Sequence, residues 1–427
     1  MITIADATLL LCKSKTAVAL KLTGALMAAA IAAPVLAGPL TFEQAIARAQ
    51  ANAPSLQGKR LGTQASRAAR VAAGALPDPK LSLGIDSFPI SGPLAFKPSQ
   101  DNFTWAKIGL SQDIPNPSKR RAQRIRADAD IAAAEADVTL EARTVEVGTA
   151  VAWLKLAFAQ QRLAVVDKQR IPLDRLVRTT PNSVAAGTAR PAQTLAGQQA
   201  LAELDDRRED LVAEIGRARA ELTRWTGEVD PGIAGQVPSF AVNQVSLRES
   251  LDDNPLLAPF EARIGQASAD VRLAEADRKS DFGVDAAYLH RDPRFGDYVS
   301  AGVTISLPFF TRNRQNAAIA ARQAQAGQAG EEREAARRAV AANLEAGLAD
   351  HAMHHEQWLR SRRTLEPLAR ERVDLETASY GAGRASLVEV VDAHIALVNA
   401  ALTTLDREAL VEIDAAKLTL AYRSPTR

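Results

Sequence analysis

The sequence predicts a mainly helical protein with a small β part, built as two similar halves. Long stretches rich in Ala, Glu, Arg, Gln and Leu predict helices. Four short stretches alternate apolar and polar residues, as strands with one buried face do. The stretch AAGTARPAQTLAGQQAL from Ala185 aligns without a gap with GAGRASLVEVVDAHIAL from Gly381. A repeat at this distance along the chain indicates duplication of a whole structural half.

A second pair of stretches supports the duplication. The segment IGLSQDIPNPSKRR from Ile108 matches AGVTISLPFFTRNR from Ala301, which places Gly109 on Gly302. We therefore expect a first repeat at 38–228, a linker at 229–244, a second repeat at 245–423 and a C-terminal tail at 424–427.

Residues 1–37 are predicted to be a secretory signal peptide. Three lysines precede an apolar run that ends in a small-residue pattern, Val-Leu-Ala, before Gly38. The run is shorter than the ~20 apolar residues that a membrane-spanning helix needs, so we expect cleavage rather than a membrane anchor. The lone cysteine, Cys12, precedes the run, whereas a lipid-attachment cysteine would follow it.

The charge and cysteine content exclude two classes of protein. The chain has a formal net charge of +2, and residues 1–37 hold three lysines and one aspartate. A chain that begins near Gly38 is therefore about neutral and lacks cysteine. This composition argues against a nucleic-acid partner and against a fold held by disulfides.

Each repeat is predicted to run as helix, strand pair, long helix and return helix. The first repeat has a helix over 42–75 broken at Pro54, strands over 80–88 and 103–114, a long helix over about 118–179 that flexes at Pro172, and a return helix over about 190–225. The second has strands near 282–290 and 298–307, a long helix over about 313–380 and a return helix to 422. A coiled-coil seam is predicted by apolar residues every seven positions, namely Ile131, Val138, Val145 and Ala152.

The strands have the length and alternation of outer-membrane strands. Each approaches the ~9 to 11 residues that cross a bilayer at a tilt. In the last strand one face holds Val299, Ala301, Val303, Ile305 and Leu307, and the other holds Ser300, Gly302, Thr304 and Ser306. Four strands cannot close a barrel, and open strand edges do not occur in hydrocarbon, so several chains must share one barrel.

This order of elements resembles the TolC family of outer-membrane efflux channels. The segment LPFFTRNRQNAAIAARQAQAG from Leu307 resembles the strand-to-helix junction of the heavy-metal branch, the cobalt-zinc-cadmium type. The resemblance implies a homotrimer in outer-membrane lipid, with a shared 12-stranded β-barrel continued by an α-barrel of long coiled-coil helices through the periplasm. It also implies a periplasmic adaptor protein, an inner-membrane RND-type proton antiporter and an exported divalent metal cation, with organic compounds as the alternative cargo.

The resemblance also assigns candidate site residues near the two bends. It makes the bends docking tips for the adaptor, formed by Gly187 and Thr188 in one repeat and by Gly383 and Arg384 in the other. Glycine suits a reversal because it tolerates positive φ, although a plain helix cap would use it equally.

A periplasmic gate is the second site that the resemblance implies. The family's gate motif falls on Tyr380, Glu389 and Asp392, and a spacing of three places both carboxylates on one helix face. A solvated helix face is the alternative for such a pair. The first repeat has Pro191 and Gln193 after its bend, so an acidic ring would come from the second repeat alone.

Three histidines within one long helix are the only candidate metal ligands. Residues four apart on a helix can share a divalent ion, and His351, His354 and His355 offer that spacing. They lie in mid-helix with only Asp350 and Glu356 beside them, which favours no resident metal.

Nothing in the sequence predicts an enzyme or a cofactor. The kinase-like strings HRD at His290 and DFG at Asp281 occur in reversed order on a strand hairpin. The alternative from another class is a secreted periplasmic coiled-coil protein with a structural or adaptor role.

Overall fold

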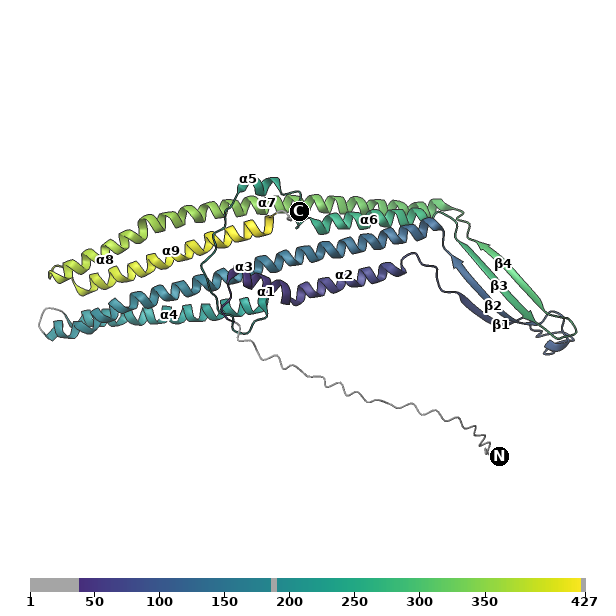
Figure 1. Ribbon diagram of the computed structural model, residues 1–427, viewed down its shortest axis with the longest axis horizontal. Helices are drawn as coiled ribbons and strands as arrows, with labels where there is room; N and C mark the ends of the chain where they lie inside the picture. Colours follow the sequence, from purple (N-terminus) through teal and green to yellow (C-terminus); the bar gives the residue numbers. More distant parts are fainter. Residues whose placement is uncertain (1–37, 186–189, 424–427) are drawn as a thin grey trace, which may run out of the picture. The chain divides into compact units, whose positions relative to one another are not determined.

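The computed structural model describes residues 38–185 and 190–423 and contains two long helical hairpins and one sheet (Figure 1). The first hairpin pairs α3 (Pro117–Ala185) with α4 (Pro191–Thr226). The second pairs α7 (Gln315–Arg360) and α8 (Glu366–Gly381) with α9 (Leu387–Tyr422). The predicted order of helices and strands in both repeats is confirmed. Residues 1–37 and 424–427, predicted as signal peptide and tail, lie outside the described residues.

Shorter helices flank the two hairpins. They are α1 (Phe42–Asn52), α2 (Pro54–Ala72), α5 (Gln244–Glu249) and α6 (Ala258–Ala276). The predicted helix over 42–75 is divided at Ala53, because Pro54 has no amide hydrogen to donate and therefore opens a new helix. Thr41 accepts a hydrogen bond from the amide of Gln44 and so caps α1. Packing of α2 against α3 and of α6 against α3 and α7 thickens the hairpins near the sheet.

Four antiparallel strands form a single sheet in the order β1-β2-β3-β4. They are β1 (Lys80–Asp86), β2 (Trp105–Ile114), β3 (Phe282–His290) and β4 (Tyr298–Ile305), and two short 3₁₀ turns lie at Pro98–Gln100 and Thr311–Asn313. The pairing of β2 with β3, from Ala106↔His290 to Ile114↔Phe282, joins the two repeats. Among the described residues, the outer edges of β1 and β4 have no strand partner.

The first long helix is longer than predicted and is not interrupted at Pro172. It continues through Pro172 to Ala185 as one helix of 69 residues. At ~1.5 Å per residue it spans about 100 Å. Its predicted seam is buried at Val145 and Ala152 and half-buried at Ile131 and Val138. The seam therefore packs most tightly midway along the helix, where α1 also covers it.

A π-helical segment interrupts the second long helix, which the sequence did not predict. It covers Ser361–Leu365, between α7 and α8. Arg407 of α9 donates a hydrogen bond to the carbonyl oxygen of Gln357 at 3.2 Å and another to the hydroxyl of buried Ser361. A π turn widens the backbone hydrogen-bond ladder, and here the guanidinium supplies a polar partner at that point.

Helix α9 forms the apolar centre that joins the two hairpins. Near the bends, Val166 and Leu211 of the first hairpin share a core with Leu387, Val398 and Leu402 of α9. In the described part of the chain, α9 is the one helix long and apolar enough to cross a membrane, but half of its apolar window is buried against protein. That burial is typical of a core helix.

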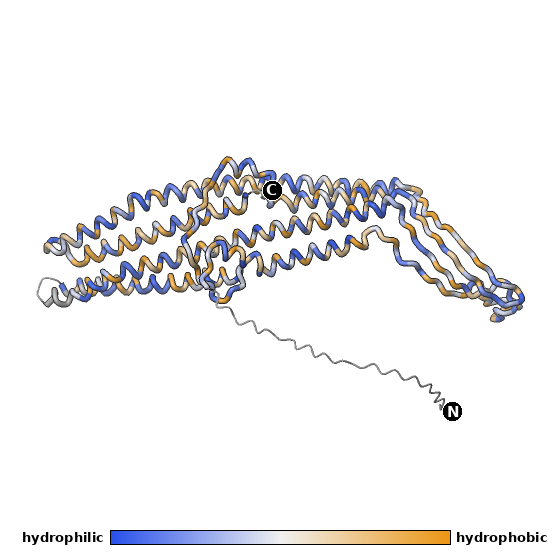
Figure 2. The backbone as a smooth tube through the Cα atoms, viewed as in Figure 1, coloured by the Kyte–Doolittle hydropathy of each residue, from blue (hydrophilic) through white to orange (hydrophobic). Residues whose placement is uncertain are grey.

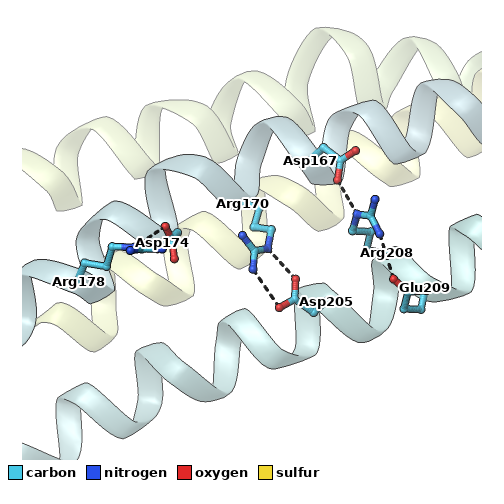
Figure 3. A network of polar contacts seen from close by, with 7 residues as sticks. All are labelled: Asp167, Arg170, Asp174, Arg178, Asp205, Arg208 and Glu209. Atoms are coloured by element: carbon cyan, nitrogen blue, oxygen red, sulfur yellow. Dashed lines mark hydrogen bonds and ion pairs between the residues drawn. The ribbon is translucent and has the colours of Figure 1, made fainter.

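Ion pairs line the surface of the first hairpin (Figure 3). Arg170 of α3 meets Asp205 of α4 through two hydrogen bonds of 2.6 and 3.1 Å, and Arg208 of α4 meets Asp167 of α3 at 3.0 Å. Such exposed pairs each contribute about 0 to 1 kcal/mol. These pairs contribute more to the alignment of α3 against α4 than to the free energy of folding.

Candidate channel wall and hairpin tip

One face of the sheet is mostly apolar across all four strands, with Gln112 and His290 as polar members. Because antiparallel partners share a face, Leu83, Ile108, Tyr288 and Val299 form one row across the sheet. The next row holds Leu81, Leu110, Ala286 and Ala301. No Asp, Glu, Lys or Arg of these four strands lies on this face, and Figure 2 shows hydrophobic and hydrophilic residues mixed along each strand. An exposed apolar face of this extent suits contact with lipid.

The opposite face carries all the charged residues of the strands and most of the small polar ones. Lys80 pairs with Asp113 at 2.6 Å, and Lys107 lies 3.7 Å from Asp86. Serine, threonine and glycine occupy most of the remaining positions, namely Ser82, Gly84, Gly109, Ser111, Gly283, Ser300, Gly302 and Thr304. The predicted alternation of β4 is confirmed and extends over most of the sheet, although Trp105, Leu289 and Tyr298 share the polar face near the loops.

A hydrogen-bonded junction fixes where the sheet meets the helices. Buried Asn116 caps α3 by accepting from the amide of Lys119 at 2.8 Å. Its amide nitrogen and side chain both donate to Asp281, which precedes β3, at 2.7 and 2.9 Å. The sequence reasoning missed this pair, although an Asn before Pro-Ser at a helix start is a signal for a cap. These bonds hold the connection between β2 and α3 in the first repeat against the connection between α6 and β3 in the second.

Arg291 links the two loops at the far end of the sheet. It donates to the backbone and side-chain oxygens of Asn102, in the other loop, at 2.9 and 2.7 Å. It also donates to the carbonyl of Gly296 at 2.7 Å and stacks over the ring of Tyr298 at 4.3 Å. This arginine belongs to the HRD string that resembled a kinase motif, and no feature of the sequence pointed to its structural role.

The second bend is a Schellman motif centred on Gly383. Its amide donates to the carbonyl of Tyr380 at 3.0 Å, and the amide of Arg384 donates to the carbonyl of Ser379 at 2.8 Å. Gly383 has φ +70°, which residues with a side chain rarely adopt. The expectation that the helix ends and reverses here is confirmed, and the side chain of Arg384 is exposed. Gly187 and Thr188 of the first bend lie outside the described residues.

The three predicted gate residues lie close in sequence but in different settings. Tyr380 is half-buried against the core that joins the hairpins. Glu389 and Asp392 are both exposed near the start of α9. Asp392 makes no hydrogen bond or ion pair with any residue in the described ranges.

Glu389 also has a local structural role. Its carboxylate accepts a hydrogen bond from the amide of Ser386 at 2.6 Å, and the Ser386 hydroxyl accepts from the amide of Glu389 at 3.3 Å. This capping box closes the first turn of α9. The hydrogen bonds from Ser386 lower the pKa of Glu389, so the carboxylate stays charged at neutral pH. The sequence signal for this cap is the Ser-x-x-Glu spacing of Ser386 and Glu389.

The histidines of α7 are not brought together as a metal site. His354 binds Asp414 of α9 at 2.7 Å, and the ring centroids of His351 and His355 lie 6.2 Å apart. Burial lowers the pKa of His351. Within residues 38–185 and 190–423, no group of three or more His, Cys, Asp or Glu side chains has the geometry to hold a metal ion.

Comparison with known proteins identifies the family. Residues 246–422 match the family described as Outer membrane efflux protein. The second repeat therefore carries the domain of this family. The match covers the second repeat, including β3, β4, the π-helical segment and the second bend.

Relatives of this outer membrane efflux protein extend over both repeats. The chain is 24% identical over 382 residues to the cobalt-zinc-cadmium resistance protein CzcC of Cupriavidus metallidurans, with 86% of each chain covered. A membrane protein from Pseudomonas aeruginosa has the same fold, with a TM-score of 0.77, 16% identity, and 89% of this chain and 90% of that chain covered. The structure of CusC gives a TM-score of 0.75 at 15% identity, with 90% and 92% covered.

The family and the sheet together define what kind of molecule this is. It is an outer-membrane efflux channel, and it extends from the outer membrane into the periplasm. The family consists of transport channels rather than enzymes. The apolar face of β1–β4 is then the surface toward lipid, and the polar face is the surface toward the channel.

Proposed function

We propose that three copies of this chain form the exit duct of a tripartite efflux pump that exports divalent heavy-metal cations. The observation that carries the proposal is the sheet, which has a largely apolar face without Asp, Glu, Lys or Arg and two open edges, at β1 and β4. Backbone groups at an open edge cannot be satisfied by hydrocarbon, so the edges must pair between chains. Three chains of four strands supply the twelve strands of a closed barrel.

The hairpin bends are the proposed contact for a periplasmic adaptor, which would couple the duct to an inner-membrane RND-type proton antiporter. Glu389 and Asp392, exposed beside the second bend, are proposed to line the periplasmic entrance with Tyr380. The proposal for the cargo is supported by the similarity to CzcC, whose name refers to cobalt, zinc and cadmium resistance.

Disulfide trapping tests the shared barrel. The one cysteine of the sequence, Cys12, lies in the predicted signal peptide, so engineered thiols would be unique once residues 1–37 are removed. Ser82→Cys in β1 would be combined in turn with Ser300→Cys and with Thr304→Cys in β4. These positions lie on opposite edges of one sheet and can meet only between chains. Oxidation in isolated outer membranes should give a covalent trimer, whereas each single variant should not. A soluble periplasmic monomer would contradict the proposal and favour a structural coiled-coil protein.

Growth assays test the cargo. Deletion of the gene should lower the tolerated concentrations of cobalt, zinc and cadmium salts, and the wild-type gene should restore them. Unchanged metal tolerance with increased sensitivity to organic compounds would instead assign the channel to drug export.

A further inference from the structure

We infer that Asp285 of β3 gives the β-barrel its own preference for cations, in addition to any selection at the hairpin tip. The inference rests on the proposed trimeric channel. It concerns a different part of the molecule, since β3 and the second bend lie at opposite ends of α7 and α8. Hydrated mono- or divalent cations are the class of solute concerned.

The charge on the polar face of the sheet is paired except at this residue. Its charged side chains are those of Lys80, Asp86, Lys107, Asp113 and Asp285. The two lysines are matched with Asp113 and Asp86 at 2.6 and 3.7 Å. Asp285 has no hydrogen bond or ion pair with any described residue. The face therefore carries one uncompensated negative charge in each chain.

Gly302 makes room for this carboxylate. Asp285 and Gly302 are direct partners in the β3–β4 register. A Cβ atom placed on Gly302 would lie 2.7 Å from one carboxylate oxygen of Asp285 and 2.9 Å from the other. A side chain at 302 would have to displace the carboxylate. Because Gly302 has no side chain, the carboxylate of Asp285 can lie over the backbone of β4 and does not project into the channel.

The surroundings of Asp285 offer further oxygen atoms. It lines a hollow of about 500 Å³ at the helix end of the sheet, together with Ser111, Thr304 and Ser306. Two other carboxylates reach this hollow, but Asp113 is paired with Lys80, and Asp281 is held by Asn116 and Lys119. Rings of carboxylates are a common means of favouring cations in a pore.

The expected effect is modest and additive. The attraction between a monovalent cation and a carboxylate about 8 Å away in water raises the local concentration of the cation about twofold. Three copies of Asp285 around one barrel should together change the ratio of cation to anion permeability by several-fold at low salt. Screening should remove most of this effect at 1 M salt, where the Debye length is about 3 Å.

The test uses the purified full-length channel in planar bilayers with a potassium chloride gradient. Asp285→Asn has the same shape and should shift the reversal potential toward anion permeation, and Asp285→Lys should shift it further. The matched control is Lys80→Gln with Asp113→Asn, which removes a charged pair on the same face at no change in net charge and should leave the reversal potential unchanged.

Two results separate this inference from the proposed function. If the wild-type protein forms no channel, the proposed function is wrong. If the wild-type protein forms channels and Asp285→Asn has the same reversal potential, only the inference is wrong. If Asp285→Asn does not assemble, Ser111→Lys supplies the test, because Ser111 is the register partner of Asp285 and an ammonium there should neutralise it. Cation preference that persists in an assembled Ser111→Lys channel would also overturn the inference.

Discussion

Glu389 and Gln193 occupy equivalent positions in the two repeats, and each accepts a hydrogen bond from the backbone amide three residues before it. Glu389 accepts from Ser386 at 2.6 Å, and Gln193 accepts from Arg190 at 3.1 Å. The second repeat thus carries a charge where the first performs the same capping with a neutral amide. The capping role and the charge of Glu389 can therefore be separated experimentally.

Glu389→Gln should keep the first turn of α9 closed, whereas Glu389→Ala should open it. The reason is that the glutamine oxygen can accept the Ser386 amide, as Gln193 accepts that of Arg190. Hydrogen exchange at the Ser386 amide measures this directly. We expect protection close to wild type for Gln and faster exchange for Ala. Equal exchange in both variants would show that the cap does not hold this turn.

Removing the two negative charges while keeping the helix cap tests the proposed gate. The double variant Glu389→Gln, Asp392→Asn should reduce cation preference and weaken block by multivalent cations added from the periplasmic side, because a ring of carboxylates favours cations. Reversal potentials and blocking curves in planar bilayers provide the measurement. An unchanged reversal potential would show that these carboxylates do not line the entrance.

Gly383→Val should disturb the second bend while the trimer still assembles. The left-handed conformation costs a residue with a side chain about 1 to 2 kcal/mol. No atom lies within 4 Å of a Cβ placed there, so the cost comes from the backbone and not from a clash. Gly383→Asn is the matched control, because asparagine tolerates positive φ better than other residues. Hydrogen exchange over 379–386 should increase more for Val than for Asn. Normal adaptor cross-linking by the Val variant would contradict the role of this bend as a docking tip.

Arginine substitutions distinguish the two faces of β4. Val303→Arg places a charge on the apolar face and should cost roughly 2 to 4 kcal/mol if it lies near the middle of the membrane. Thr304→Arg, one residue later, faces the channel and should cost much less. The fraction of heat-resistant trimer and urea unfolding of the folded channel measure the difference. An equal loss of trimer in both variants would show that the facing of β4 is wrong.

The second hairpin should lose stability as the pH falls below about 6.5, partly because of His394. Burial lowers the pKa of His394 in the folded protein, against the opposing effect of Asp374. The unfolded state therefore binds more protons as the pH falls below the ordinary histidine value of about 6.5, and the stability present above that value is lost. Thermal unfolding of the detergent-solubilised protein between pH 7.5 and 5.5 should show this slope. His394→Leu should reduce the slope, and an unchanged slope in this variant would show that His394 does not contribute to it.

The sequence determined the local structure and the facing of each strand. Side chains alternate along a strand, so the pattern of Val299 to Ile305 specified which residues share a face before any partner strand was known. The duplicated bend likewise placed a helix reversal at Gly383, since few residues other than glycine adopt its positive φ. The TolC-like order of elements followed from these local patterns.

Only the tertiary structure decided which distant residues meet. Arg407 and the π-helical segment lie on different helices, Asn116 and Asp281 lie in different repeats, and Arg291 reaches Asn102 across two loops. The pairing of β2 with β3 likewise determined that Asp285 shares its face with two lysines already matched to other carboxylates. Sequence periodicity encodes the face on which a side chain lies, but not its partner, because the partner depends on packing between segments far apart in the chain.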